Sequence, residues 1–357
     1  MQSGVLKQAS LRDGHAKDTH QGWSLGDLTM LNRLDPARII SGTQLLDRRS
    51  ALLGFGALAG TAGLAGCAPP EPANQPEKSL NLDFSNPEDN LTAWVKLVSS
   101  LENGVETCGF FSGTHYAVIG AQKVIEPLFR IQGFGMSRVT LLPDGRYENL
   151  HRELVYYLPL REDRILETWD NPYTGETVEI FNTHNDPVNS YYSTRFKQTF
   201  GTEESGFETV EFPFILPWET FGDRVIVSFA VNTRWPTPLD PEKWQREHFG
   251  DWYRTSEYFQ IHSSLANLNN PDMPKVPYTG AWQKVAPWHP WMLMDNQEGG
   301  ILGISNVFSL NSTDELPAHI KEYTEKHYPE YLHAPDKWVE PNMTTWETFA
   351  KEREPAK

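Results

Sequence analysis

The chain has few of the residues on which disulfide-built and metal-built folds depend. It contains only two cysteines in 357 residues. If Cys67 carries a lipid, as argued below, Cys108 is the only thiol left. An intrachain disulfide and a cysteine-type zinc site are then both excluded. Cys108 could act as a nucleophile, but its setting between Thr107 and Gly109 favours a small buried apolar side chain.

Common catalytic motifs are also missing. There is no glycine-rich phosphate loop, dinucleotide fingerprint, Gly-x-Ser-x-Gly elbow or His-Glu-x-x-His zinc helix. These absences argue against nucleotide-driven enzymes, Rossmann oxidoreductases and the common hydrolases and zinc proteases. General acid–base enzymes need only two or three positioned groups, which can be far apart in sequence. We therefore expect any chemistry to use no metal and no cofactor.

Positive charge is scarce as well. The 31 Lys and Arg residues face 47 Asp and Glu residues, which gives a net charge of −16. An acidic chain of this kind repels phosphate backbones, so nucleic acid is not an expected partner. It also lacks the basic surface that attracts anionic membranes, so we expect membrane contact only through a lipid anchor.

The N-terminal region carries an export signal. Arg48 and Arg49 precede a short apolar stretch at 51–65, and Ala65 and Gly66 stand directly before Cys67. This pattern predicts twin-arginine export, cleavage before Cys67, lipidation of Cys67 and a periplasmic, membrane-anchored lipoprotein. Two alternatives stay open: a buried helix after a disordered tail, and an unused leader on a cytoplasmic protein. The true start codon could be that of Met30.

The remaining sequence predicts one domain after a linker. We expect a leader at 1–66, a proline-rich tether at 67–79 and a single mainly-β domain at 80–357. Short strands are separated by tight turns, for example at Pro143-Asp144-Gly145 and Phe221-Gly222-Asp223. The predicted class is α+β, mainly antiparallel β, with a curved sheet or barrel-like body and a few peripheral helices.

Three helices are predicted around this sheet. The first covers 91–97 after capping residues at 86–90, the second covers 241–253, and the third follows a cap at 311–314. Strands are expected at 212–215, 258–263, 280–284 and 300–308, among others. The tail beyond Pro329 is expected to wrap the body as loops.

Two polar clusters are candidate sites. In the first, His184, Asp186 and Asn189 follow a predicted strand, where His184 could move protons, Asp186 could orient it or act as a base, and Asn189 could bind substrate. A turn that closes a hairpin, with His184 bonded to backbone, is the alternative, and a metal site would need ligands that the sequence does not supply.

The second cluster is Trp252, Tyr253 and Arg254, with Glu257 three residues on. Tyr253 could transfer protons, and a buried Arg254 could hold a phenolate or carboxylate. A surface Arg254–Glu257 pair on a helix is the alternative.

Two further clusters offer aromatic surface. The segment 277–294 is rich in tryptophan around a histidine and could form the floor of an aromatic pocket, or simply core; its candidates are Tyr278, Trp282, Trp288, His289 and Trp291. On a strand at 151–157, Arg152 and Tyr156 share one face, whereas His151, Glu153 and Tyr157 share the other. Which set faces inward cannot be read from the sequence.

Several stretches together resemble a bacterial family catalogued as domain of unknown function eighteen thirty-eight. They are spread over about 80–350 and comprise Asn86 to Leu91, Gly133 to Arg138, Asn171 to Thr177, Asn185 to Asn189, Val276 to Gly280, Pro290 to Met294 and Tyr328 to Pro335. The resemblance implies a single exported domain. It implies no reaction and no catalytic residue.

Three functions remain open. We expect a cofactor-independent lyase that uses acid–base chemistry on a small aromatic or phenolic compound, by carbon–oxygen elimination, ether-ring opening or retro-aldol release of an aldehyde. The alternatives are a non-catalytic lipoprotein that binds an aromatic or hydrophobic ligand, and a carbohydrate-active envelope protein. Titratable groups converging in one pocket with shifted pKa values would favour the enzyme. Self-association into a homo-oligomer is left open.

Overall fold

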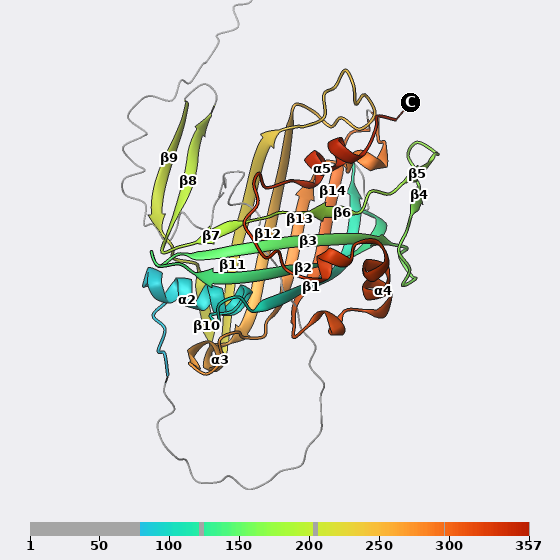
Figure 1. Cartoon of the computed structure of the whole chain (residues 1–357). Coiled ribbons are helices and arrows are strands. Elements are labelled where there is room, and N and C mark those ends of the chain that lie inside the picture. Colours follow the sequence, from blue (N-terminus) through green and yellow to red (C-terminus); the bar gives the residue numbers. More distant parts are fainter. Residues whose placement is uncertain (1–78, 121–124, 203–205, 296, 357) are drawn as a thin grey trace, which may run out of the picture.

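The computed structural model describes residues 79–120, 125–202, 206–295 and 297–356 (Figure 1). The predicted leader, the lipidation site Cys67 and the tether up to residue 78 lie outside these residues. Among the described residues, no helix is long and apolar enough to cross a membrane.

One large sheet dominates the described part of the chain. It has ten strands in the order β10-β11-β12-β13-β14-β1-β2-β3-β6, with β7 also paired to β3, and every neighbouring pair is antiparallel. The strands are β1 (Glu106–Val118), β2 (Glu126–Leu141), β3 (Tyr147–Leu158), β6 (Thr183–Asn185), β7 (Ser190–Tyr192), β10 (Trp218–Phe221), β11 (Arg224–Pro236), β12 (Trp252–Ser264), β13 (Thr279–Ala286) and β14 (Gly300–Leu310).

The sheet is open at its ends, since β10 pairs only with β11 and β6 only with β3 among the described residues. The predicted class, mainly antiparallel β with a curved sheet, is therefore confirmed. Two hairpins stand apart from the sheet: β4 (Thr168–Asp170) with β5 (Thr177–Glu179), and β8 (Arg195–Thr202) with β9 (Gly206–Pro213).

The strands alternate between an inner face and an outer face. On β3, Glu153 and Val155 line the same cavity as Phe259 of β12 and Lys284 of β13, so the sheet curves around that space. His151, Glu153 and Tyr157 therefore form the inward set that the sequence left undecided. Close strand contact needs glycine at Gly133, where an added Cβ would lie 2.4 Å from Cζ of Phe111.

The outer face of β1–β3 is covered by C-terminal elements. Leu154, Tyr156 and Leu158 pack there with Ile320 of α4 (Ala318–His327) and Tyr331 of the 3₁₀ turn η4 (Pro329–Leu332). Cys108 lies in the same cluster with 1% of its surface exposed, and burial raises the pKa of its thiol to about 12. A thiol in that state is not a nucleophile at neutral pH.

The other helices sit at the ends of the sheet. The helix predicted over 91–97 is present as α2 (Pro87–Val98), but it begins four residues earlier, directly after its N-cap Asn86. Its Lys96 is buried, and the Nζ donates to the carbonyls of Asn267, Leu268 and Asn270 at the end of α3 (Leu265–Asn269). Helix α2 and the β8–β9 hairpin lie at one end of the molecule, whereas α4 and α5 (Thr345–Glu352) lie toward the other (Figure 1).

Some local predictions are wrong. The segment 241–253 is not a helix: residues 241–247 form turns, Gly250 takes a φ of 115°, and β12 begins at Trp252 because its backbone groups pair with β11. Residues 214–215 are not in a strand; β9 ends at Pro213, and β10 supplies the partner of β11 instead.

The C-terminal region also departs from prediction. After the cap at Ser312 only the 3₁₀ turn η3 (Thr313–Glu315) forms, because Pro317 lacks an N–H, and α4 starts at Ala318. The tail is not all loop. Helix α5 forms there behind a capping box between Thr344 and Glu347, in which each side chain bonds to the other's backbone N–H.

Candidate functional site

The inner face of the sheet encloses a small cavity of about 100 Å³. Its walls come from β1, β3, β6, β11, β12, β13 and the start of α5. The aromatic Phe and Trp side chains in its lining are Phe111, Trp235, Phe259, Trp282 and Trp346. The polar lining residues are Glu153, Thr183, Asn185, Tyr253, Thr255, Glu257, Lys284, His289, Thr344 and Thr345. Charged groups in an aromatic enclosure of this kind need partners or a function.

Lys284 and Glu257 form the first charged pair of the cavity. The Nζ of Lys284 lies 3.9 Å from Oε1 of Glu257, on neighbouring positions of β13 and β12. The other oxygen, Oε2, accepts a hydrogen bond of 3.1 Å from Nε1 of Trp282. About a fifth of each charged side chain is exposed, 19% for Lys284 and 20% for Glu257. The pair is thus shielded from bulk water but not sealed.

Glu153 supplies the second carboxylate, from β3. One oxygen accepts a hydrogen bond from Nδ2 of Asn185, and the other lies 3.9 Å from Nε2 of His151. The opposite ring nitrogen of His151, Nδ1, is 2.8 Å from Oγ of Ser137, and this hydrogen bond orients the imidazole. The groups around Glu153 are therefore arranged to favour its charged form.

The two carboxyl groups have pKa values shifted in opposite directions. Burial raises the pKa of Glu257, and the charge of Glu153 adds to this rise, while Lys284 acts against it. Burial also acts to raise the pKa of Glu153, but His151 and Asn185 outweigh it and leave that pKa lowered. Opposed shifts of two nearby acids are typical of an acid–base pair.

Lys284 stays charged in this setting. Burial alone would lower its pKa, but Tyr253 and the carboxylates Glu257 and Glu153 outweigh burial and raise it. A fixed ammonium in a low-dielectric cavity attracts developing negative charge far more strongly than it would in water.

Two stacked histidines lie beside the charged groups. Nε2 of His289 is 3.4 Å from Nδ1 of His115, and both rings are buried. Burial lowers both pKa values, that of His115 to about 3, with the charge of Lys284 adding to the effect. Both rings are therefore neutral at physiological pH. Nδ1 of His289 and Nε2 of His115 have no hydrogen-bond partner among the described residues.

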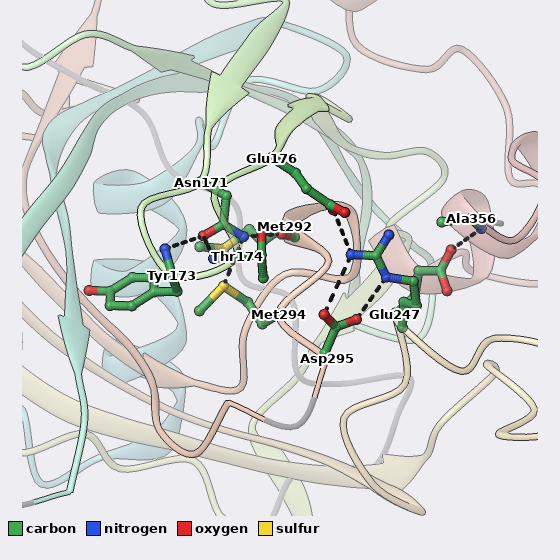
Figure 2. A network of polar contacts seen from close by, with 10 residues as sticks. Asn171, Tyr173, Thr174, Glu176, Glu247, Met292, Met294, Asp295 and Ala356 are labelled. Carbon is green, nitrogen blue, oxygen red and sulfur yellow. Dashed lines mark hydrogen bonds and ion pairs between the residues drawn. The ribbon is translucent and has the colours of Figure 1, made fainter.

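His289 also lines a second, wider cavity of about 360 Å³, which it shares with Trp288, Phe249 and Arg246. Arg246 closes one side of this cavity by binding Glu176 at 2.6 Å and Asp295 at 2.7 Å (Figure 2). Glu247, also in the lining, accepts a hydrogen bond from the backbone of Ala356 near the C-terminus (Figure 2). His289 thus lines both cavities, and we call the wider one the vestibule.

The structure brings some sequence-predicted site residues to these cavities. Tyr253, Trp282 and His289 line the inner cavity, and Trp288 lines the vestibule, where its Nε1 donates to the carbonyl of Gln297. Trp291 is buried behind them and stacks on His289 with ring centroids 5.9 Å apart. The tryptophan-rich segment 277–294 thus supplies side chains that line the two cavities. It also supplies Trp291, which packs behind them.

The first polar cluster lies on the opposite face of the sheet. His184 pairs with Leu154 of β3, packs on Phe181 and Tyr328, and has its Nδ1 2.8 Å from the carbonyl of Asn182. Because its strand neighbours Thr183 and Asn185 face the cavity, His184 faces away from it. The expected catalytic position of His184 is corrected accordingly.

Asp186, Arg152 and Tyr156 lie on that outer side as well. Nη2 of Arg152 is 3.4 Å from Oδ2 of Asp186, and Nη1 donates to the carbonyl of Glu330. Burial raises the pKa of Asp186, although Arg152 opposes the rise. Tyr156 bonds to Oγ1 of Thr324 in α4 at 2.8 Å. These contacts join the sheet to the C-terminal elements and place none of the three residues at the cavity.

The remaining predicted residues are also away from the cavity. Arg254 and Trp252 are exposed on β12, and the strand conformation excludes the helical Arg254–Glu257 pair, since residues three apart point to opposite faces. Tyr278 is buried in the core with 2% exposure. Asn189 exchanges hydrogen bonds with Asn342 and donates to the carbonyl of Val339, so it anchors the C-terminal tail.

Sequence reasoning missed Glu153, Glu257 and Lys284 as site residues. A signal was present in the alternation: Thr255, Glu257 and Phe259, or Trp282 and Lys284, share one face of a strand whose other members are buried. A charge on an apolar strand face is unusual. Among the described residues, no group of three or more His, Cys, Asp or Glu side chains could hold a metal ion.

Comparison with known proteins gives a family but no activity. No curated protein matches the chain. A family model described as "Protein of unknown function (DUF1838)" matches residues 105–353. The match corrects the extent of the resemblance expected from sequence, because it begins at 105 and leaves out Asn86 to Leu91 and all of α2. It covers the ten-stranded sheet and every residue of the inner cavity, and the chain belongs to this family.

Proposed function

We propose that this protein is a cofactor-independent acid–base enzyme, a lyase acting on a small aromatic or phenolic compound in the inner cavity. The observation that carries the proposal is the convergence of Glu153, Lys284 and Glu257 on one aromatic-walled space. A binding protein for an apolar ligand has no use for three ionisable groups in its cavity, because desolvating them costs free energy. An enzyme that moves protons does.

The proposed roles follow from the charges. Glu257, whose raised pKa makes it a stronger base than an exposed glutamate, takes a proton from the substrate carbon. The electron pair left behind forms the new double bond, and the bond between carbon and the leaving oxygen breaks. Lys284 stabilises the negative charge that develops, and the phenolic hydroxyl of Tyr253 or the protonated Glu257 returns a proton to the leaving oxygen. No electrons are exchanged with an outside reagent.

The dimensions of the cavity restrict the substrate. An enclosed apolar space of about 150 Å³ admits a benzene ring. At about 100 Å³ the inner cavity is of that order, so it would take a single ring or a short side chain. A larger remainder of the substrate would lie past His289 in the vestibule of about 360 Å³.

The test is incubation of the purified full chain with a panel of phenolic monomers and dimers, without added cofactor, followed by mass spectrometry. Loss of one compound with a matched product supports the proposal, and the mass difference identifies the reaction. Lys284→Met should abolish that conversion. Gln283→Met is the matched control, since Gln283 is the exposed neighbour on the same strand. If the Lys284→Met variant still converts the compound, the inner cavity is not the active site.

A non-catalytic binding protein is the second candidate. The observation in its favour is that Lys284 and Glu257 already neutralise each other at 3.9 Å, so the cavity does not demand a charged substrate. If the protein only binds its ligand, some compounds of the panel would bind to it but none would be converted. The binders would then raise the unfolding temperature in proportion to their affinity.

We also propose export by the twin-arginine route and anchoring through a lipid on Cys67, which rests on the leader sequence alone. Cys67→Ala should release the protein from the membrane fraction. Unchanged membrane recovery would refute the lipid anchor.

A further inference from the structure

A third cavity, of about 440 Å³, lies at the other end of the sheet, near α2 and the β8–β9 hairpin. None of its lining residues is shared with the inner cavity or the vestibule. Its volume falls within the range of small-molecule sites, which is roughly 300–1,000 Å³. We refer to it as the α2 groove.

The floor of the α2 groove is apolar and largely aromatic. Trp94 of α2 packs edge-on against Phe229 and Phe214, with ring centroids 5.5 and 6.4 Å apart. Ile215 and Leu216 complete the floor. Phe229 in turn stacks on Phe259 at 5.0 Å, and Phe259 lines the inner cavity. One aromatic layer thus separates the two sites, and a ligand in the groove does not reach Lys284.

The mouth of the groove is cationic, although the protein as a whole is acidic. Arg146, Arg195 and Lys197 line it, against a single carboxylate, Glu211. Arg195 binds Glu211 at 2.8 Å, and Arg146 binds Asp144 and lies over the ring of Tyr191. Lys197 is exposed and has no salt bridge to any described residue. In a chain of net charge −16, this local excess of positive charge favours an anion at the mouth.

We propose that the α2 groove binds a small monocarboxylate with an apolar body. The carboxylate meets Lys197 at the mouth, beside Arg146 and Arg195, and the apolar body lies on Phe214, Phe229 and Leu216. This site is separate from the inner cavity and does not depend on the proposed lyase activity.

Calorimetric titration of the full chain with 4-phenylbutanoate and with the neutral 4-phenylbutan-1-ol tests the proposal. We expect the carboxylate to bind at least about tenfold more tightly than the alcohol, and Lys197→Glu to weaken the carboxylate by a similar factor.

Two control variants test whether the binding is specific to the α2 groove. Lys326→Glu removes an exposed lysine of α4 at the far end of the molecule, and Lys284→Met removes the cation of the inner cavity. Both should bind 4-phenylbutanoate as the wild type does. Equal affinity for acid and alcohol, unchanged binding by Lys197→Glu, loss of binding with Lys284→Met, or no binding at all would each overturn the proposal. None of these outcomes would decide whether the inner cavity is catalytic.

Discussion

Arg152 and Glu153 are neighbours on β3, yet they belong to two charged clusters with different physical roles. Glu153 points inward, where it shares a cavity with Lys284 and Glu257. Arg152 points outward, where it binds Asp186 and the carbonyl of Glu330 and covers the ring of Tyr331. The outer charged groups are paired with other groups of the protein in a packed region. The inner charges border empty space, and only they are available to a substrate.

The comparison shows that residue type is a poor guide to function in this sheet. The outer cluster holds the histidine, aspartate and arginine that the sequence makes attractive, with His184 between Phe181 and Tyr328. The inner cluster holds a lysine and two glutamates, which on a strand are usually solvent-exposed. What separates the clusters is that the inner charges line a cavity, whereas the outer charges lie between packed elements of the protein.

The largest expected effect tests the inner cluster. Lys284→Met should lower turnover by at least about a thousandfold on the substrate found in the panel, because it removes the cation that stabilises the developing anion. Single-turnover product formation measures it. Gln283→Met, on the outer side of the same strand, should keep wild-type rates. A loss shared by both variants would indicate damage to β13 instead.

The next effect tests the outer cluster. Arg152→Ala should lower the free energy of unfolding by about 2 kcal/mol, because it leaves a partly buried Asp186 without its cation. Urea unfolding measures this loss. Turnover per folded molecule should stay at the wild-type value. As a control, Arg254→Ala changes an exposed arginine of β12 and should alter stability by at most about 0.5 kcal/mol.

If Arg152→Ala instead abolishes turnover while the fold persists, the outer cluster takes part in the chemistry. The distinction between the two clusters would then fail.

The pKa values of Glu257 and Glu153 are shifted in opposite directions, so the two carboxyl groups make different predictions for the pH dependence. The pKa of Glu257 is raised in the folded protein above the ordinary value of 4.5. Its contribution to stability is therefore fully present below pH 4.5 and is lost as pH rises through the folded-state pKa. Glu257→Gln should remove this decline, as measured by unfolding at a series of pH values.

Glu153→Gln should move the acidic limb of the rate–pH profile to lower pH. The reason is that the charge of Glu153 helps to raise the pKa of Glu257. A profile that stays in place would show that Glu257 is not the base, whereas a shift to higher pH would contradict the direction of the coupling.

The smallest effect concerns His184. His184→Gln disrupts the contacts of the imidazole with the carbonyl of Asn182 and with Oε1 of Glu352, and it should cost about 1 kcal/mol of stability without changing turnover. Tyr253→Phe is the matched comparison, since it deletes a single hydroxyl inside the cavity and should change turnover instead. The opposite pattern would restore His184 as a catalytic candidate.

Local sequence signals predicted much of the sheet. The turn at Asp144 and Gly145 marks the β2–β3 hairpin, and alternation on β3 separates Arg152 and Tyr156 from Glu153 and Tyr157. The sequence does not show which strands that are far apart in the chain lie next to or opposite each other. Whether Glu153 faces in or out depends on β12 and β13 curving back over β3, more than a hundred residues along the chain. For the same reason 252–253 is strand, since its backbone pairs with β11.

The site residues were harder to predict than the fold. His289 and Trp282 stand out by composition, and both reach the inner cavity. Lys284 and Glu257 carry no local motif, and each becomes notable only beside the other. A charge in a strand predicts solvent exposure unless the opposing face is known.

The position of α5 bears on when the cavity comes into existence. Thr344, Thr345 and Trp346 form one wall of the inner cavity, although every strand of the sheet is already complete at Leu310. A growing chain emerges from the ribosome N-terminus first, so the sheet can assemble while this wall is still unsynthesised. A chain that stops at residue 343 would keep all ten strands and have an open site. The closing wall of the cavity is therefore built by a segment that lies outside the sheet and is made after its last strand.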